Sequence, residues 1–120
     1  MAPSKTLDLT DVAQRLKKFA HERDWEKFHS PKNLAMALSV EVAELLEHFQ
    51  WLSEEQSRRI SPEALASVSE EAADILLYLV RLSDKLDIDL VAATNKKLSL
   101  NARKYPADKA RGTSKKYTEL

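Results

Sequence analysis

The stretch SVEVAELLEHFQW, residues 39–51, decides how this sequence folds. As a helix it carries apolar side chains on nearly every side, among them Leu45 and Phe49, so it predicts an element that is largely buried. Two carboxylates, Glu41 and Glu44, nevertheless stand in its middle. A buried carboxylate is unfavourable unless it is compensated, so the stretch predicts both a helical core and a partner for these charges.

The same arrangement recurs in EEAADILLYLV, residues 70–80, where Glu71 and Asp74 are again three residues apart. Side chains at positions i and i+3 project from one face of a helix, about one turn apart, so each pair can bind a single ligand. If the two helices pack through their apolar faces, four carboxylates meet inside the protein: those of Glu41, Glu44, Glu71 and Asp74.

Such a group of carboxylates predicts a metal site, because few cationic side chains are available nearby. The helix that contains Glu41 has only Lys32 and His48, and the helix that contains Glu71 has Arg81 and Lys85 toward its far end. Burying one unpaired carboxylate costs several kcal/mol. Ligand sets made only of oxygens select hard cations, so we expect Mg²⁺, with Mn²⁺ as the alternative ion.

Other interpretations of the acidic residues stay open. Either pair alone is also typical of a solvated helix surface, and the neighbouring Glu47 and Glu70 either support the metal or face water. A di-iron bundle would use Glu-x-x-His on two helices. Here Glu44 and Asp74 occupy those third positions, and His48 lies four residues beyond Glu44. Iron chemistry is therefore the weaker interpretation.

Composition and start signals predict an all-α fold. The 120-residue chain has one glycine, and 43% of its residues are hydrophobic. This favours one domain built as an antiparallel four-helix bundle, with a core over about residues 8–105 and an extended basic tail over 106–120. The first main helix is expected to begin at about residue 6 or 8 and to end at residue 22. The other main helices are expected over about residues 31–50, 62–86 and 90–104, and a short helix is expected to end near residue 60.

The helix starts have specific signals. Ser30 and Ser61 each precede a proline, which predicts an N-cap followed by proline at the first helical position. Ser53 and Gln56 have the spacing of a capping box. Either Asp87 or Asp89 is expected to cap the last main helix.

Charge and composition exclude several classes of function. Residues 1–95 hold 11 Lys and Arg against 17 Asp and Glu, whereas residues 96–120 hold 8 against 2. An acidic body that binds cations beside a basic end that binds phosphates suits a small polyanion rather than a nucleic acid polymer, although a merely solvated tail looks the same. The sequence has no cysteine, and its first residues, MAPSKTLDL, lack the apolar core of a signal peptide. It also has no apolar run long enough to span a membrane, so we expect a soluble, cytoplasmic protein.

Aromatic and basic residues are candidates for nucleotide binding. Aromatic rings can stack on a nucleobase, although a tryptophan in a small helical protein is more often part of the core. A basic strip at helical spacing can bind phosphate oxygens, although a surface strip looks the same. The aromatic-side candidates are Trp25, Phe28, His29, Trp51 and Tyr78, and the phosphate-side candidates are Lys97, Asn101, Arg103 and Lys104.

The two acidic motifs, with 26 residues between them, resemble the metal motif of the MazG-like superfamily of all-α nucleoside triphosphate pyrophosphohydrolases. ERDWEKFHSPKNL, HFQW, DILLYLV, NARKYP and SKKYTEL are similar, more narrowly, to the dCTP pyrophosphatases within it, over about residues 9–120. The chain departs from the animal forms at Leu16, where they carry histidine, and in a shorter loop after Trp51.

The resemblance implies a reaction and an assembly. Mg²⁺ bound by the four carboxylates would promote hydrolysis of a (deoxy)nucleoside triphosphate, such as dCTP or a modified dCTP, to the monophosphate and pyrophosphate, cleansing the nucleotide pool. The aromatic candidates would line the nucleotide pocket and the basic candidates would reach the phosphates across a subunit interface of a homodimer or homotetramer. The general base is unassigned among Glu41, Glu44 and Glu71. An iron-handling bundle and a structural dimerisation module are the alternatives.

Overall fold

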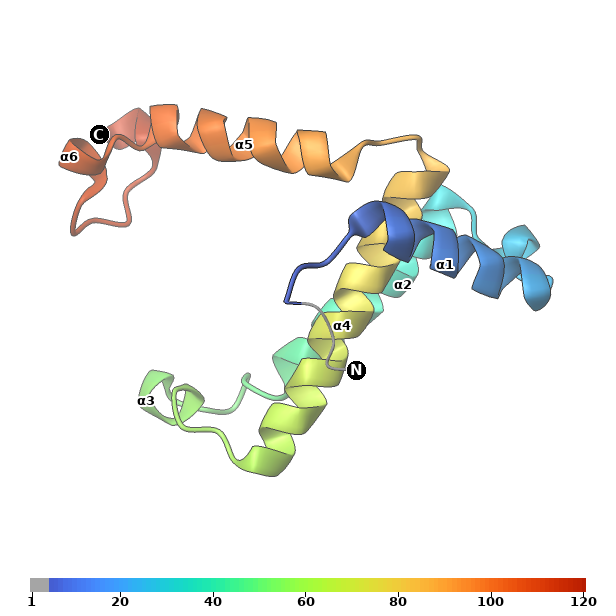
Figure 1. Ribbon diagram of the computed structural model, residues 1–120. Coiled ribbons are helices and arrows are strands. Elements are labelled where there is room, and N and C mark those ends of the chain that lie inside the picture. The colour runs from blue at the N-terminus through green and yellow to red at the C-terminus, as the bar shows by residue number, and fades with distance from the viewer. Residues whose placement is uncertain (1–4) are drawn as a thin grey trace. The chain divides into compact units, whose positions relative to one another are not determined.

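The computed structural model describes residues 5–120, and this part of the chain contains helices and no strands (Figure 1). The all-α prediction is therefore confirmed. The chain divides into one compact unit that ends at Ile88 and a second that covers Asp89–Leu120. In chain order the elements are α1 (Leu9–Glu22), the 3₁₀ helix η1 (Glu26–Phe28), α2 (Pro31–Glu47), α3 (Glu54–Ser57), α4 (Pro62–Lys85), α5 (Leu90–Lys104), α6 (Ala107–Ala110) and the 3₁₀ helix η2 (Tyr117–Glu119).

The helices of the first unit begin where the sequence signals place them. The Oγ atoms of Ser30 and Ser61 accept hydrogen bonds from the backbone N–H groups of Asn33 and Ala64, each at 3.1 Å. Ser53 and Gln56 form both hydrogen bonds of a capping box. These local contacts satisfy N–H groups that have no partner within the helix, which explains why short sequence signals suffice.

Two helices end through an aspartate in the left-handed region of backbone space. Asp24 follows α1 and Asp87 follows α4, each with φ of 54°. After α4, the N–H of Ile88 donates to the carbonyl of Ser83 and that of Asp87 to the carbonyl of Asp84. This is the Schellman pattern, which usually uses glycine, and aspartate is one of the few other residues that tolerate it.

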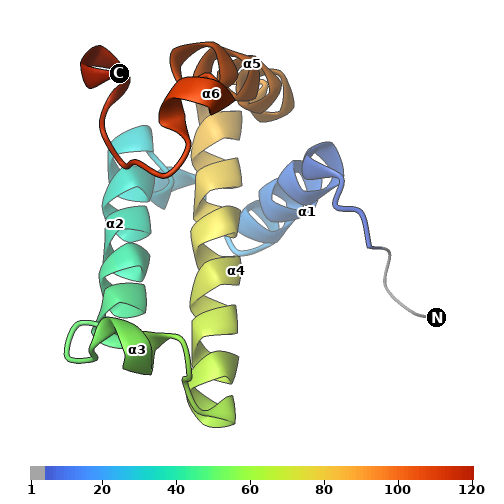
Figure 2. The ribbon, with the colours of Figure 1, turned by 90° about the vertical axis from the view of Figure 1, so that its left-hand side faces the viewer.

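Packing within the first unit centres on α4. α2 runs antiparallel beside α4, and α1 crosses one end of α4 (Figure 2). Among residues 5–120, the buried hydrophobic side chains are Val12, Ala20, Leu34 and Val80, which mark a small core where these three helices meet. α2 ends at Glu47, earlier than the predicted residue 50, because the chain turns over residues 48–52. From this core, the paired helices α2 and α4 extend side by side to α3, which connects their far ends (Figures 1 and 2).

The second unit consists of α5, α6 and η2. Asp89 is the N-cap of α5, so the choice between Asp87 and Asp89 is settled. Sequence periodicity gave no reason to expect helical turns in the last fifteen residues, but α6 and η2 are present there. The rings of Tyr105 and Tyr117 meet edge to face at 6.0 Å, and Lys104 Nζ lies 4.7 Å from the Tyr117 ring centre. These contacts between residues distant in sequence hold the final segment against the end of α5.

No helix within residues 5–120 is both long enough and apolar enough to cross a bilayer. The prediction that the chain has no signal-peptide core depends partly on residues 1–4, which lie outside the described residues. The prediction of one domain over residues 1–120 stays a prediction.

Candidate functional site

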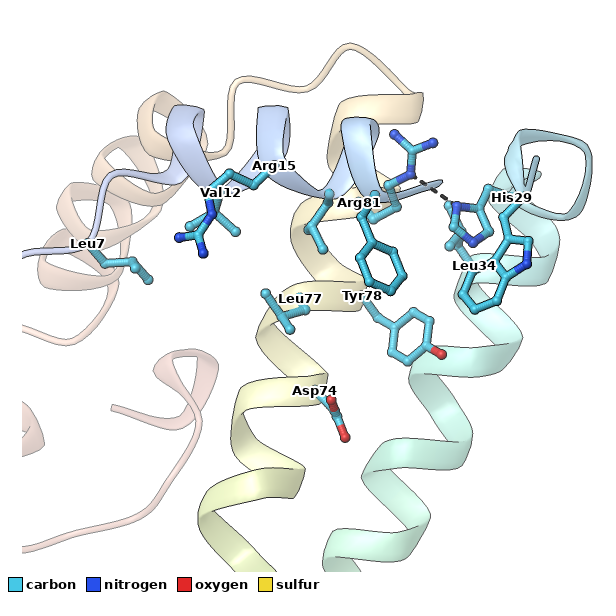
Figure 3. Close-up of a pocket in the computed structure, with 12 residues that line it drawn as sticks. Leu7, Val12, Arg15, His29, Leu34, Asp74, Leu77, Tyr78 and Arg81 are labelled. Carbon is cyan, nitrogen blue, oxygen red and sulfur yellow. Dashed lines mark hydrogen bonds between the residues drawn. The ribbon is translucent and has the colours of Figure 1, made fainter. Parts of the chain in front are cut away.

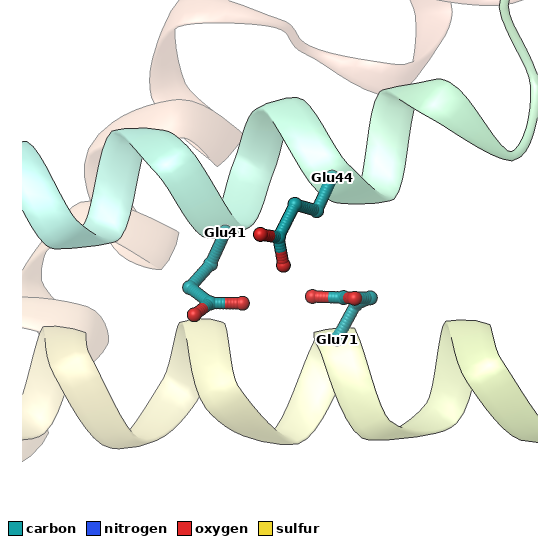
Figure 4. A group of neighbouring side chains, drawn as sticks. All are labelled: Glu41, Glu44 and Glu71. Atoms are coloured by element: carbon teal, nitrogen blue, oxygen red, sulfur yellow. The ribbon is translucent and has the colours of Figure 1, made fainter.

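Three of the four predicted carboxylates meet between α2 and α4. Glu41 and Glu44 project from α2 toward Glu71 on α4 (Figure 4), and one oxygen from each lies within 4.8 Å of the other two. All three side chains are half-buried. The i, i+3 spacing on α2 places both glutamates on the face that α4 covers.

The cluster lacks compensation from the protein. Glu41 Oε2 and Glu71 Oε2 are buried without a hydrogen-bond partner, and within residues 5–120 none of the three carboxylates forms an ion pair. The adjacent Glu71 carboxylate raises the pKa of Glu41 to about 7, with burial and the negative charges of Glu44 and Asp74 adding to the effect. Unpartnered oxygen atoms that face one another are what a divalent cation requires, so the cluster fits a hard metal ion.

Asp74, the fourth predicted ligand, lies outside this cluster. It is one turn further along α4, and its side chain is exposed and lines a neighbouring pocket (Figure 3). Its charge nevertheless acts on Glu41, so the pocket and the carboxylate cluster adjoin at this residue.

The pocket has a volume of about 580 Å³ and lies between α1, η1 and α4. Three of the predicted nucleotide-binding residues line it: Trp25, His29 and Tyr78. Phe28 and Trp51 do not line it, and their side chains are 58% and 86% exposed. Trp51 therefore has no place in the core of this chain. Most of the other lining residues are apolar, namely Leu7, Val12, Leu16, Phe19, Leu34 and Leu77.

Aromatic contacts hold the Trp25 indole at the edge of the pocket. Its ring meets Phe19 edge to face at 5.7 Å and His29 at 6.4 Å. Trp25 is still 43% exposed, so part of its ring is free to contact a ligand. An apolar pocket that carries aromatic rings and a few polar groups is typical of small-molecule sites.

The structure adds a buried ion network that the sequence did not reveal. Arg81 is 3% exposed, and its guanidinium donates to Glu26 Oε1 at 2.7 Å and to His29 Nδ1 at 3.1 Å. Lys85 donates to the second oxygen of Glu26. These contacts with Lys85 and Arg81 lower the pKa of Glu26 to about 2. The one available signal was an arginine inside the apolar run LLYLVRL; its partner Glu26 is 55 residues away.

The predicted phosphate-binding residues belong to the second unit, on α5. Lys97, Asn101 and Arg103 are exposed, whereas Lys104 is half-buried against Tyr117. Their role stays a prediction.

Comparison with known proteins decides the family. The sequence profile of the MazG-like family matches residues 36–120, which include all four predicted carboxylates. The chain belongs to the MazG-like family. This confirms the resemblance seen in the sequence.

Several proteins that are similar to this MazG-like chain are named as pyrophosphatases. It is 45% identical to human dCTP pyrophosphatase 1 over 121 aligned positions, covering 99% of the chain and 70% of the human protein. It is 45% identical to the bovine protein of the same name, covering 93% of the chain and 68% of that protein. Among solved structures, a pyrophosphatase from Archaeoglobus fulgidus is similar with a TM-score of 0.77 and 38% identity, covering 88% of this chain and 99% of the archaeal one.

Proposed function

We propose that this MazG-like protein is a Mg²⁺-dependent pyrophosphohydrolase that converts dCTP, or a modified dCTP, to the monophosphate and pyrophosphate. The observation that carries the proposal is the group of Glu41, Glu44 and Glu71. Two of these glutamates, Glu41 and Glu71, have a buried oxygen without a partner, and the group adjoins an aromatic-lined pocket at Asp74. The names of the curated relatives support dCTP as the substrate.

The carboxylates would bind the metal from two sides. Glu41 and Glu44 would contribute from α2 and Glu71 from α4, with Asp74 reaching the ion or its water shell from the pocket side. When bound, Mg²⁺ neutralises triphosphate charge and lowers the pKa of a coordinated water. Mn²⁺ has a similar preference for oxygen ligands and is the natural alternative ion.

The proton from the attacking water would pass to a carboxylate of the cluster. The base would be one of Glu41, Glu44 and Glu71, whose carboxylate oxygens lie within 4.8 Å of one another. Direct attack by water is the simplest route, since the site contains no serine or cysteine nucleophile among the residues named above.

The pocket would bind the nucleoside. Trp25 and Tyr78 offer ring faces and edges for the base, and His29 offers a polar atom beside them. Stacking of a base on an aromatic ring contributes about 1–3 kcal/mol. The volume of about 580 Å³ is within the usual range for small-molecule pockets.

We further propose that the active form is a homodimer or homotetramer with sites built between subunits. Large apolar side chains are exposed on both long helices, including Met36, Val40 and Leu46 on α2 and Leu65 and Leu79 on α4. Apolar surface of this extent is typical of a protein–protein interface. Phe28 and Trp51, exposed in one chain, would then complete the nucleotide pocket, and Lys97, Asn101, Arg103 and Lys104 would contact phosphates.

In the cell, such an enzyme would remove unwanted nucleotides from the precursor pool. The absence of cysteine from the sequence supports the cytoplasm as its compartment.

One assay tests the proposal against its rivals. The protein is incubated with Mg²⁺ and a panel containing dCTP, 5-methyl-dCTP, dTTP, dATP, dGTP and CTP, and pyrophosphate and orthophosphate are measured separately. We expect pyrophosphate and the monophosphate in equal amounts, with the cytosine deoxynucleotides preferred. Orthophosphate as the product would contradict pyrophosphohydrolysis. Release of neither, together with Fe²⁺ oxidation or with no metal binding, would support the iron-handling or the structural alternative.

A further inference from the structure

The hydrogen bond between Arg81 and His29 fixes where the imidazole of His29 carries its proton. Arg81 Nε donates to His29 Nδ1 at 3.1 Å (Figure 3). An arginine in a protein stays protonated and can only donate, so Nδ1 must be the acceptor. The neutral ring then carries its proton on Nε2, the nitrogen on the opposite side from Arg81.

Arg81 is itself held in place by ions on two elements. Its guanidinium donates to Glu26 Oε1 at 2.7 Å and lies 3.6 Å from an oxygen of Asp84, while Lys85 donates to the other Glu26 oxygen. The Arg81 side chain is almost completely buried, so it has little freedom to change its conformation. Glu26 belongs to η1 and His29 follows that helix directly, so the same contacts anchor the segment that carries His29.

The surroundings also keep His29 uncharged. Burial and the positive charge of Arg81 lower the pKa of His29, against the opposing effect of Glu26. A third cation beside Arg81 and Lys85 would be unfavourable in this half-buried position. His29 therefore combines two properties: an occupied Nδ1 and a donor at Nε2 in the wall of an apolar pocket.

We propose that Arg81 is a positioning residue that holds His29 as an Nε2–H donor for an acceptor atom of the base bound in this pocket. The inference rests on the proposed function, because it takes the pocket to be the nucleoside site. A cytosine ring offers two such acceptors, its carbonyl oxygen and its unprotonated ring nitrogen. The rival explanation is that the Arg81 network only fastens η1 to α4.

The first experiment measures the protonation of His29 directly. Nitrogen-15 NMR of the histidine rings in the full-length protein reports which nitrogen carries the proton, and His29→Phe assigns the signals. We expect a neutral Nε2–H ring at pH 7 in the unaltered protein. The pKa of His29 should be higher in Arg81→Met, because the positive charge of Arg81, which lowers that pKa, is then removed. A charged His29 at pH 7, or a proton on Nδ1, would overturn the proposal whatever the enzyme hydrolyses.

The second experiment measures binding of dCMP in the presence of Mg²⁺ by calorimetry. We expect His29→Phe and Arg81→Met each to raise the Kd of dCMP roughly three- to tenfold, the range of one lost hydrogen bond. His29→Gln, whose amide can donate from the same region, should restore most of the affinity. Arg81→Met should add little to His29→Phe, because Arg81 acts through His29.

Circular dichroism would check that each variant is folded. If Arg81→Met is unfolded, Arg81→Lys and Glu26→Gln would be measured in its place. Equal dCMP affinity in all folded variants would show that the network is only structural, while the proposed function would stand. Additive effects of Arg81→Met and His29→Phe would likewise contradict action through His29. If the unaltered protein binds none of dCMP, dTMP, dAMP and dGMP, the pocket is not a nucleoside site and this inference fails regardless of the NMR result, whereas the proposed function is decided by the release of pyrophosphate.

Discussion

Glu41 on α2 and Glu71 on α4 face one another, and each has a buried carboxylate oxygen with no hydrogen-bond partner (Figure 4). Two like charges at this distance repel one another, and burial strengthens the repulsion. Either a proton or a cation must relieve it. The pKa of about 7 at Glu41 describes the first solution, and a divalent metal ion would supply the second.

Replacing Glu71 by glutamine should separate stability from activity. Glu71→Gln keeps the shape of the side chain and removes one of the repelling charges, so the metal-free protein should become as stable as the original or more so. Its stabilisation by Mg²⁺ should be lost, whereas the unaltered protein should gain about 2.7 kcal/mol at 100 times the Kd of the ion. Pyrophosphate release should fall by at least about 100-fold. Thermal unfolding with and without Mg²⁺ measures both stabilities.

Glu47→Gln is the matched control for this variant. Glu47 lies on α2, one turn beyond Glu44, and is exposed. It should change neither the Mg²⁺ response nor the rate appreciably. Equal losses in Glu47→Gln and Glu71→Gln would mean that general charge, and not the cluster, binds the ion.

The pH dependence of stability should have opposite signs at Glu41 and Glu26. The folded pKa of Glu41, about 7, lies above its ordinary value of 4.5, so its contribution is present below pH 4.5 and is lost as the pH rises toward 7. The folded pKa of Glu26, about 2, lies below 4.5, so its contribution is present above pH 4.5 and is lost as the pH falls toward 2. Urea unfolding in EDTA, compared between the unaltered protein, Glu41→Gln and Glu26→Gln, measures each window.

A metal ion should reverse the behaviour of Glu41. Binding requires the ionised carboxylate, so Mg²⁺ affinity should weaken as the pH falls below about 7, and binding there should release a proton. A Mg²⁺ affinity that does not change between pH 6 and pH 8 would contradict the placement of Glu41 at the ion.

Local signals predicted the helices, and contacts between distant residues account for what was missed. Ser30, Ser53 and Ser61 each accept a hydrogen bond from an N–H group three residues away, so their caps can be predicted from the sequence. By contrast, the turns after α5 depend on Tyr105 meeting Tyr117, which no local pattern specifies.

The same distinction applies to the site. Helical spacing placed Glu41 and Glu44 on one face, and apolar neighbours turned that face toward Glu71. How far α4 is rotated about its axis depends on packing against α1 and α2, so spacing alone did not show that Asp74 would line the pocket instead. The arginine inside the apolar run LLYLVRL was the one local signal of the buried ion network, and its pairing with Glu26, 55 residues away, depends on the fold of the whole first unit.

Asp87→Gly should stabilise the protein. Asp87 has φ of 54°, where a side chain costs about 1 kcal/mol relative to glycine, although glycine also gains freedom in the unfolded chain. We expect a net gain of about 0.5 kcal/mol in the free energy of unfolding. Asp87→Ala is the control and should lose stability, because alanine has the same steric conflict without the polar side chain. A gain in Asp87→Ala equal to that in Asp87→Gly would point to the removed charge instead.

Refolding an inactive variant together with a weakened one should restore activity if sites are shared between subunits. Trp51 is 86% exposed and does not line the pocket between α1, η1 and α4, so Trp51→Ala should leave stability nearly unchanged while raising the KM for dCTP about tenfold or more. Glu41→Gln should abolish turnover. If each site takes Glu41 from one subunit and Trp51 from the other, unfolding and refolding the two variants together should give hybrid dimers with one intact site, and about a quarter of the original activity at low dCTP. A mixture no more active than Trp51→Ala refolded alone at the same concentration of that variant would mean that each chain builds its own site.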